Sequence, residues 1–212
     1  MADTRVKLVL ASASPRRLML LERMGLAPDL LNPTDLDETP KRRETPRRLS
    51  IRLAEEKAKV AIHAPQVQAL GSGVFILAAD TVVGLGRRIL PKAETRKDAY
   101  ACLTLLSGRS HWVYSTVCII APNGQKTTRC CETKVRFKRL SREDIESYLK
   151  SDEWRGKAGG YAIQGRAEAF VRHLTGSYSG VMGLPLYETV HLLEGAGYPV
   201  LHSWMTTASA SV

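Results

Sequence analysis

One apolar stretch near the middle of the chain carries a carboxylate. Residues 74–83 are apolar except for Asp80 and Thr81. A continuous apolar run of this length predicts a strand that is buried on both faces of a sheet. A carboxylate in such a strand is costly to bury unless it is paired, metal-bound or catalytic. We therefore expect Asp80 to belong to a functional site, the alternative being a structural hydrogen bond to a turn.

The other helix and strand signals alternate along the chain. Helices are expected over residues 15–25, 46–63, 95–106, 141–151 and 185–194. Strands are expected over residues 6–11, 113–121 and 127–137, and a hairpin at 84–90. A further strand is expected after the glycine-rich loop 154–165, and a short one near residue 200. Thr95 and Asp98 have the spacing of a capping box, and Asn123-Gly124 is a strong hairpin turn. This alternation predicts an α/β fold, with helices around one mixed sheet in three layers or two lobes.

Length and composition further restrict the class of protein. No linker divides the 212 residues, so we expect a single domain over residues 1–205 and a frayed tail over 206–212. No apolar run approaches the roughly 20 residues that span a bilayer, and the start does not resemble a signal peptide. Without a spanning segment, no membrane partner is expected. The four cysteines include no CxxC pair, which favours reduced thiols in a cytoplasmic protein. The 31 Lys and Arg against 21 Asp and Glu give a net charge of +10, which indicates an anionic partner.

A candidate anion site lies where the first strand turns into the first helix. Ser12, Ser14, Arg16 and Arg17 cluster there, with Ser14 expected as the N-cap and Pro15 as the first helical residue. Free N–H groups and the helix dipole favour an anion at such a position, and arginine forks suit phosphate oxygens. The alternative is an ordinary capped surface helix. The Walker pattern of phosphate-binding loops is absent from this segment.

Two lysines and an acidic loop are further candidates. Lys57 falls in the middle of the apolar arc of the helix expected over 46–63, so it must either reach out to solvent or meet an anion. Lys92 follows the expected hairpin. Asp35, Asp37 and Glu38 form an acidic cluster which, together with Asp80, has the oxygen ligands that Mg²⁺ prefers; taken singly, such loop acids are usually solvated.

Seven short motifs follow one another over nearly the whole chain. They are LASASPRR (10–17), DLDE (35–38), RLAEEKA (52–58), ADTVV (79–83), LSGRSH (106–111), KAGGYAIQG (157–165) and GLPLYET (183–189). Together they resemble the Maf family of nucleoside triphosphate pyrophosphatases. The resemblance implies a two-lobed fold with a central cleft, similar to that of inosine triphosphatases. It also implies a cytoplasmic homodimer that uses Mg²⁺ or Mn²⁺ to convert nucleoside triphosphates to the monophosphate and pyrophosphate.

The resemblance also implies roles for individual residues. Asp80 matches the proton acceptor, and four residues match polar positions of the cleft: Ser12, Arg17, Lys57 and Lys92. The positions that mark the subfamily acting on dTTP and UTP match Arg16, Thr81 and Gln164, and the sister subfamily acting on a methylated GTP differs where this chain has Thr81 and Gln164. Two departures stand out. Residues 90–93 read LPKA where the family usually has Leu-Gly-Lys-Pro, and residues 113–115 read VYS where Val-x-Thr is common.

These observations give a hypothesis for mechanism. A triphosphate lies in the cleft, with its charge met by Arg16, Arg17, Lys57 and Lys92, and a divalent ion is held by Glu38 and Asp80. Water attacks the α-phosphorus, and Asp80 either takes its proton or orients a metal-bound hydroxide. The residue that could read a pyrimidine edge is Gln164.

Two other functions remain open at this point. The net charge and the family's association with septum formation favour a nucleic-acid-binding or regulatory protein without enzymatic activity. Against it, no helix-turn-helix, zinc-finger or aromatic RNA-binding signature is present, so nucleic acid is not the expected partner. The second alternative is an enzyme that releases orthophosphate. A nucleotide panel with product analysis separates all three.

Overall fold

The computed structural model describes residues 6–201, and its centre is a mixed sheet of seven strands. Six strands lie in the order β2-β1-β3-β6-β7-β9, and β4 pairs with β3 beside this path. The strands are β1 (Lys7–Leu10), β2 (Leu30–Leu31), β3 (Val74–Leu85), β4 (Arg88–Leu90), β6 (Ser110–Ile120), β7 (Lys126–Phe137) and β9 (Val171–Thr175). β1 is parallel to β2 and β3, and the other pairs are antiparallel. A separate small sheet joins β5 (Lys92–Ala93) to β8 (Lys157–Ala158).

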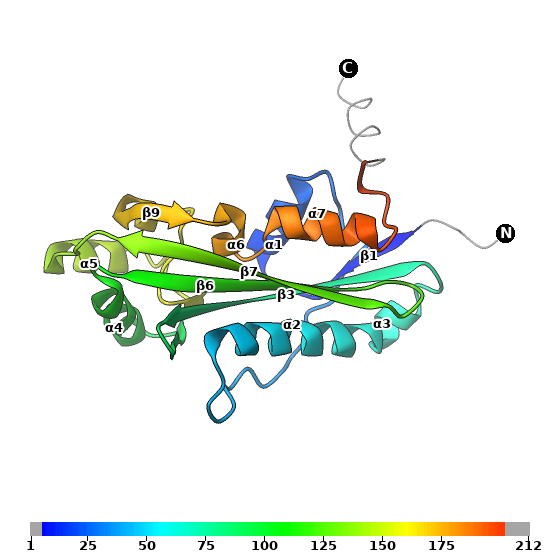
Figure 1. Ribbon diagram of the computed structural model, residues 1–212, viewed down its shortest axis with the longest axis horizontal. Helices are drawn as coiled ribbons and strands as arrows, with labels where there is room; N and C mark the ends of the chain where they lie inside the picture. Colours follow the sequence, from blue (N-terminus) through cyan, green and yellow to red (C-terminus); the bar gives the residue numbers. More distant parts are fainter. Residues whose placement is uncertain (1–5, 202–212) are drawn as a thin grey trace, which may run out of the picture.

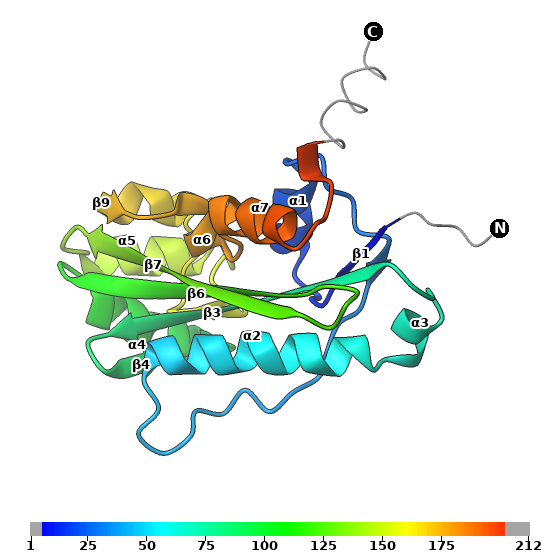
Figure 2. The same cartoon turned by 45° about the vertical axis from the view of Figure 1, so that its right-hand side comes forward.

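Helices cover both faces of the large sheet (Figures 1 and 2). They are α1 (Pro15–Glu22), α2 (Pro46–Ile62), α3 (Pro65–Gln68), α4 (Arg96–Leu106), α5 (Arg142–Leu149), α6 (Tyr178–Met182) and α7 (Leu186–Gly195), with a 3-10 helix at Arg166–Phe170. α2 and α3 lie on one face, α1, α6 and α7 lie on the other, and α4 and α5 lie at one end of the sheet (Figure 1). None of the helices among residues 6–201 has the length and apolar character needed to cross a membrane.

The alternation of side chains along β3 explains why both of its faces are covered. Ile76 and Ala78 belong to an apolar cluster in which alanines of α2 pack on the sheet. Phe75 and Leu77 belong to the larger cluster on the opposite face. By the same alternation Asp80 is directed toward α2, and Thr81 toward α1 and α6. The approach of α2 is close at its start, because a Cβ on Gly84 would lie 2.7 Å from a ring carbon of Pro46.

A break in the pairing along β3 creates the place for a site. The β1–β3 ladder ends at Leu77, and the β3–β4 ladder begins at Val83. On its other side β3 pairs with β6 from Ile76 to Gly84 without interruption. Residues 78–82 therefore have no strand partner on the side of β1 and β4 within the described chain. β1 also ends here, and in α/β sheets ligands bind in the crevice beyond the carboxyl ends of parallel strands.

Most of the predicted architecture is confirmed. Helices surround one mixed sheet, and the five expected helices and the long strands form within a few residues of their predicted limits. Thr95 and Asp98 make a complete capping box, and Asn123-Gly124 lies in the turn between β6 and β7.

Two local expectations are wrong. Val200 is helical and not in a strand; a single buried apolar residue has no periodicity by which the sequence could distinguish the two states. A 3-10 helix precedes β9 where a strand was expected directly after the glycine-rich loop. Ser14 is the N-cap residue of α1 and Pro15 its first residue, as expected, although the Ser14 side chain makes no capping hydrogen bond. The tail expected at 206–212, like the rest of residues 202–212, lies outside the described residues.

Candidate active site

The break along β3 opens into a pocket of about 310 Å³. Its walls come from the β1–α1 turn, the middle of α2, the free edge of β3, the start of β5, the glycine-rich loop and the end of α6. The predicted site residues that line it are Arg16, Arg17, Lys57, Asp80, Thr81, Lys92 and Gln164, and Lys157 joins them. The pocket walls thus carry five basic side chains and one acidic side chain, which favours a polyanionic ligand.

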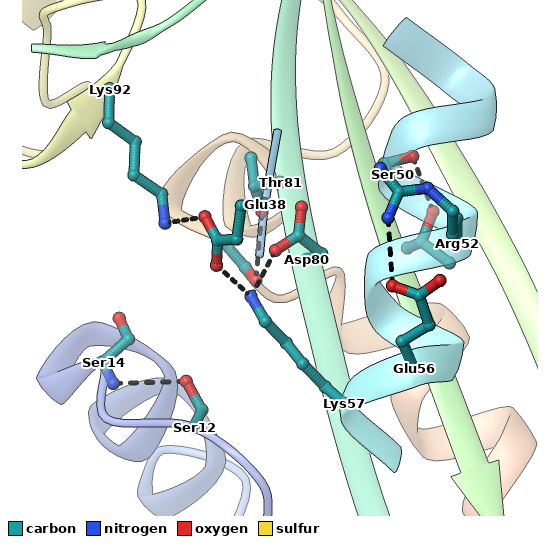
Figure 3. A network of polar contacts seen from close by, with 12 residues as sticks. Ser12, Ser14, Glu38, Ser50, Arg52, Glu56, Lys57, Asp80, Thr81 and Lys92 are labelled. Carbon is teal, nitrogen blue, oxygen red and sulfur yellow. Dashed lines mark hydrogen bonds and ion pairs between the residues drawn. The ribbon is translucent and has the colours of Figure 1, made fainter. Parts of the chain in front are cut away.

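Asp80 lies in the wall of this pocket and is paired with Lys57. It is only 4% exposed, and its Oδ1 accepts a hydrogen bond of 2.6 Å from the ammonium Nζ of Lys57. Lys57 is 7% exposed and also donates to Oε1 of Glu38 at 2.7 Å. Lys92 donates to the other carboxylate oxygen of Glu38. Figure 3 shows the resulting chain of alternating charges, which runs from Lys92 through Glu38 and Lys57 to Asp80.

Glu38 is held in its ionised form by this arrangement. Burial alone would raise its pKa, but the hydrogen bonds and charges of Lys57 and Lys92 outweigh burial and lower the pKa to about 2. The loop that carries Glu38 is anchored by Arg52 of α2, which donates to both carboxylate oxygens of Glu44, at 2.8 and 3.0 Å, and to the carbonyl of Thr39. Lys57, which was predicted to reach solvent or an anion, thus forms ion pairs with two carboxylates.

The two arginines of α1 are fixed by backbone carbonyls. Nε of Arg16 donates to the carbonyl of Met182 at 3.1 Å, and Nε of Arg17 donates to that of Gly183 at 2.8 Å. Arg17 also donates to Oγ of Ser12 at 3.0 Å. Burial lowers the pKa of Arg16, with a smaller contribution from the neighbouring charge of Arg17. Neutral carbonyls orient both guanidinium groups. Burial lowers the pKa of Arg17 as well, and the charges of Asp80 and Glu38 partly offset this effect.

Hydroxyl groups line the other side of β3. The hydroxyl of Thr81 lies 3.0 Å from that of Ser115, which donates to the carbonyl of Gly180. Ser115 stands where the family more often has threonine, and its hydroxyl still supports Thr81. Ser12 is buried, and its Oγ accepts the N–H of Ser14 as well as Arg17. Ser12 therefore contributes to the site through Arg17 and the β1–α1 turn.

The glycine-rich loop brings Lys157 and Gln164 to the pocket. Gly159 packs on Val83 of β3, since a Cβ at Gly159 would meet that side chain at 3.0 Å, and it has a positive φ of 71°. Farther along the loop, the hydroxyl of Tyr161 lies 2.8 Å from Nε2 of the fully buried His111. Burial lowers the pKa of His111 to about 4, so the imidazole is neutral at pH 7. Gln164 is exposed and lines the pocket.

A second, more apolar pocket of about 410 Å³ adjoins the first. It shares Asp80, Thr81 and Lys92 with it, and Glu38 lines it. Its apolar wall is formed by Leu49, Leu53, Val82 and Ile89. Lys92 thus stands between the two pockets, although residues 90–93 depart from the family pattern.

The structure permits a test of the expected metal site. Glu38 and Asp80 lie within hydrogen-bond distance of one ammonium nitrogen, and two such carboxylates with phosphate oxygens and water are a usual ligand set for Mg²⁺. The larger acidic cluster does not assemble: among residues 6–201 no three His, Cys, Asp or Glu side chains are arranged to hold a metal, and Asp37 accepts the N–H of Thr39. The donor set fits a divalent ion only if the ligand brings further oxygens.

Sequence patterns missed three contributors to the site. Lys157 follows a glycine in a polar loop, where a solvated charge is the ordinary expectation. The carbonyls of Met182 and Gly183 carry no side-chain signal at all. Their only trace in the sequence is the Gly-Leu-Pro motif, which begins at the residue that accepts from Arg17.

Fold and site together define an α/β protein with a cleft lined by basic side chains beside a buried carboxylate. The sequence profile of the Maf-like protein family matches residues 7–196, and the chain belongs to this family. A dTTP/UTP pyrophosphatase of Mesorhizobium japonicum is 58% identical over 200 residues, covering 94% of this chain and 96% of that protein. A dTTP/UTP pyrophosphatase of Brucella abortus is 57% identical over 200 residues, with the same coverage.

A solved structure is also similar in part. A nucleoside-triphosphatase, described as a dITP/XTP pyrophosphatase, from Mycobacterium abscessus superposes with a TM-score of 0.37 at 16% identity, over 64% of this chain and 74% of that one.

Proposed function

We propose that this protein hydrolyses nucleoside triphosphates, with dTTP and UTP as its substrates, to the monophosphate and pyrophosphate. The observation that carries the proposal is the ion pair of Asp80 and Lys57 in a cation-lined pocket at the unpaired edge of β3. Relatives at 58 and 57% identity that are named dTTP/UTP pyrophosphatases support the choice of substrates. Gln164 and Thr81 at the same pocket suit recognition of a pyrimidine edge and its sugar by hydrogen bonds.

In the proposed reaction, water attacks the α-phosphorus. A bond forms between the water oxygen and this phosphorus, and the bond from the phosphorus to the oxygen bridging to the β-phosphorus breaks, so pyrophosphate leaves. Asp80 accepts the proton of the attacking water. Arg16 and Arg17 bind phosphate oxygens, and Lys57 holds the Asp80 carboxylate in place while it balances its charge. Positioning and charge stabilisation supply most of the rate gain, as in other phosphoryl transfers.

We also propose that the reaction uses a divalent cation, Mg²⁺ or Mn²⁺. Glu38 and Asp80 are the carboxylates that would hold it, and the substrate's phosphates would complete its ligands. Bound there, the cation would supply charge neutralisation at the phosphates.

Product analysis tests the proposed function. Purified protein is incubated with dTTP, UTP, CTP, ATP and GTP, each with Mg²⁺ or Mn²⁺, and the products are separated by ion exchange. We expect equal amounts of monophosphate and pyrophosphate, fastest from dTTP and UTP. Orthophosphate with nucleoside diphosphate would refute the proposed bond cleavage, and no product from any nucleotide would refute an enzymatic function.

The setting of the protein is part of the proposal. We propose a cytoplasmic enzyme that acts as a homodimer, with residues 1–205 as one functional domain. The four cysteines are free thiols, three of them buried, which suits a reducing compartment. Sedimentation equilibrium tests the assembly: a mass near 47 kDa, twice the 23.4 kDa of the chain, is expected for the dimer.

A further inference from the structure

The basic side chains of the pocket fall into two groups with different partners. Lys57 and Lys92 each donate to a carboxylate. In the part of the chain that the structure describes, Arg16, Arg17 and Lys157 form no ion pair with a carboxylate. They donate instead to backbone carbonyls, and for Lys157 the acceptor is the carbonyl of Arg155, at 2.9 Å. The first group is in direct contact with carboxylates, and the second group is not. The charges of Asp80 and Glu38 reach Arg17 without a direct contact and partly offset the lowering of its pKa by burial.

Within the second group, Arg16 lies close enough to Arg17 and to Lys157 for their like charges to repel. Burial lowers the pKa of Lys157, and the charge of Arg16 lowers it further, with only a weaker opposing effect from Glu94. Burial and the charge of Arg17 likewise lower the pKa of Arg16. Half-buried like charges at one wall cost free energy unless an anion joins them. A phosphate group placed there would turn this repulsion into attraction.

Lys157 is also held more firmly than a lysine on a free loop. It lies in β8, where its backbone pairs with Ala93, so the strand that carries Lys157 is joined to the strand that carries Lys92. The N–H of Gly156 donates to the carbonyl of Ala93 at 2.9 Å, and that of Gly159 donates to Pro91 at 3.0 Å. The hydrogen bond from the Lys157 ammonium group to the carbonyl of Arg155 uses one of its three N–H donors. Two donors remain for a ligand in the pocket that Lys157 lines.

We infer that Lys157 is a substrate-binding residue whose ammonium group donates to a phosphate oxygen of the nucleoside triphosphate beside Arg16. This inference rests on the proposed function and adds a contact to the same site. It assigns two lysines and two carboxylates to the reacting centre, namely Lys57, Lys92, Glu38 and Asp80. Arg16, Arg17 and Lys157 then form a carboxylate-free wall that binds the charge of the phosphates.

Four variants test the inference: Lys157→Met, Lys157→Gln, Lys157→Arg, and Lys150→Met as a matched control on an exposed lysine. Loss of a charge-assisted hydrogen bond predicts a KM for dTTP about tenfold higher in Lys157→Met and Lys157→Gln. Lys157→Arg should stay within about threefold of the wild type, because it keeps the charge, and Lys150→Met should be unchanged. The slope of log(kcat/KM) against log salt concentration should be shallower in the two neutral variants.

Two results would overturn the inference. One is an unchanged KM in both neutral variants. The other is a Lys157→Arg variant as weak as Lys157→Met with an unaltered salt slope, since the lysine would then act only on the shape of the loop. Binding of inorganic tripolyphosphate, measured by calorimetry on wild type and Lys157→Met, separates this inference from the proposed function. A wild type that hydrolyses nothing would refute the function, while equal tripolyphosphate affinity of the two proteins would refute the role of Lys157.

Discussion

Replacing Lys57 by methionine perturbs the ion pair on which the site is built. The substitution removes the ammonium that lies 2.6 Å from Asp80 and 2.7 Å from Glu38 but keeps most of the apolar stem. Glu38 retains Lys92, so its carboxylate stays paired. Asp80, at 4% exposure, is left as an unpaired buried charge. Breaking a buried pair in this way costs about 3–5 kcal/mol of unfolding free energy, a large fraction of the roughly 5–15 kcal/mol that stabilises a typical domain.

Urea unfolding at pH 7 measures this cost. Lys59→Met, on an exposed lysine two residues farther along α2, should change the unfolding free energy by no more than about 0.5 kcal/mol. The double variant Lys57→Met/Asp80→Asn should be more stable than Lys57→Met alone, because it removes the stranded charge. A loss below about 1 kcal/mol in Lys57→Met, or a double variant less stable than the single one, would refute the pairing argument.

Four further predictions address chemistry and pH. Asp80→Asn should lower kcat at least about 100-fold, and a variant that keeps more than about a tenth of wild-type turnover would show that Asp80 is not the base. Gln164→Leu should reduce the preference for dTTP and UTP in a panel of kcat/KM values, and an unchanged preference would contradict its role in base recognition. Excess EDTA should abolish turnover, and added Mg²⁺ or Mn²⁺ should restore it; activity that persists in EDTA would contradict the metal. The pKa of His111 is about 4 in the folded protein and about 6.5 in the unfolded chain, so between these pH values the unfolded chain binds more protons. The free energy of unfolding should therefore fall as the pH drops from 6.5 toward 4, by up to about 3 kcal/mol. Urea midpoints at pH 7 and 5 should show this slope in the wild type and a weaker one in His111→Phe, and equal slopes would contradict it.

The site residues that the sequence predicted differ in polarity from their immediate neighbours in the chain. Asp80 stands out because its neighbours in the strand are apolar, and Lys57 because it interrupts an apolar helical arc. Burial of both side chains confirms that reasoning. Their pairing with each other was not predicted, because contact between residues 23 apart depends on how α2 packs on β3.

The parts that escaped prediction depend on long-range geometry. The break in the β3 ladder exists because β1 ends and β4 begins at different points along one strand, which no residue pattern reports. Lys157 joins the pocket through the pairing of two-residue strands, too short for any periodicity to detect. The arginines were expected at an anion site, but the carbonyls of residues 182 and 183 that orient them lie 166 residues away along the chain.

Hydrolysis in ¹⁸O-labelled water tests the central claim, which is attack of water at the α-phosphorus beside Asp80. The wild-type protein is incubated with dTTP and a divalent cation in H₂¹⁸O, and the products are analysed by mass spectrometry. The proposed mechanism predicts one ¹⁸O atom in the thymidine monophosphate and none in the pyrophosphate. Label in the pyrophosphate, with unlabelled monophosphate, would mean attack at the β-phosphorus and would contradict the mechanism.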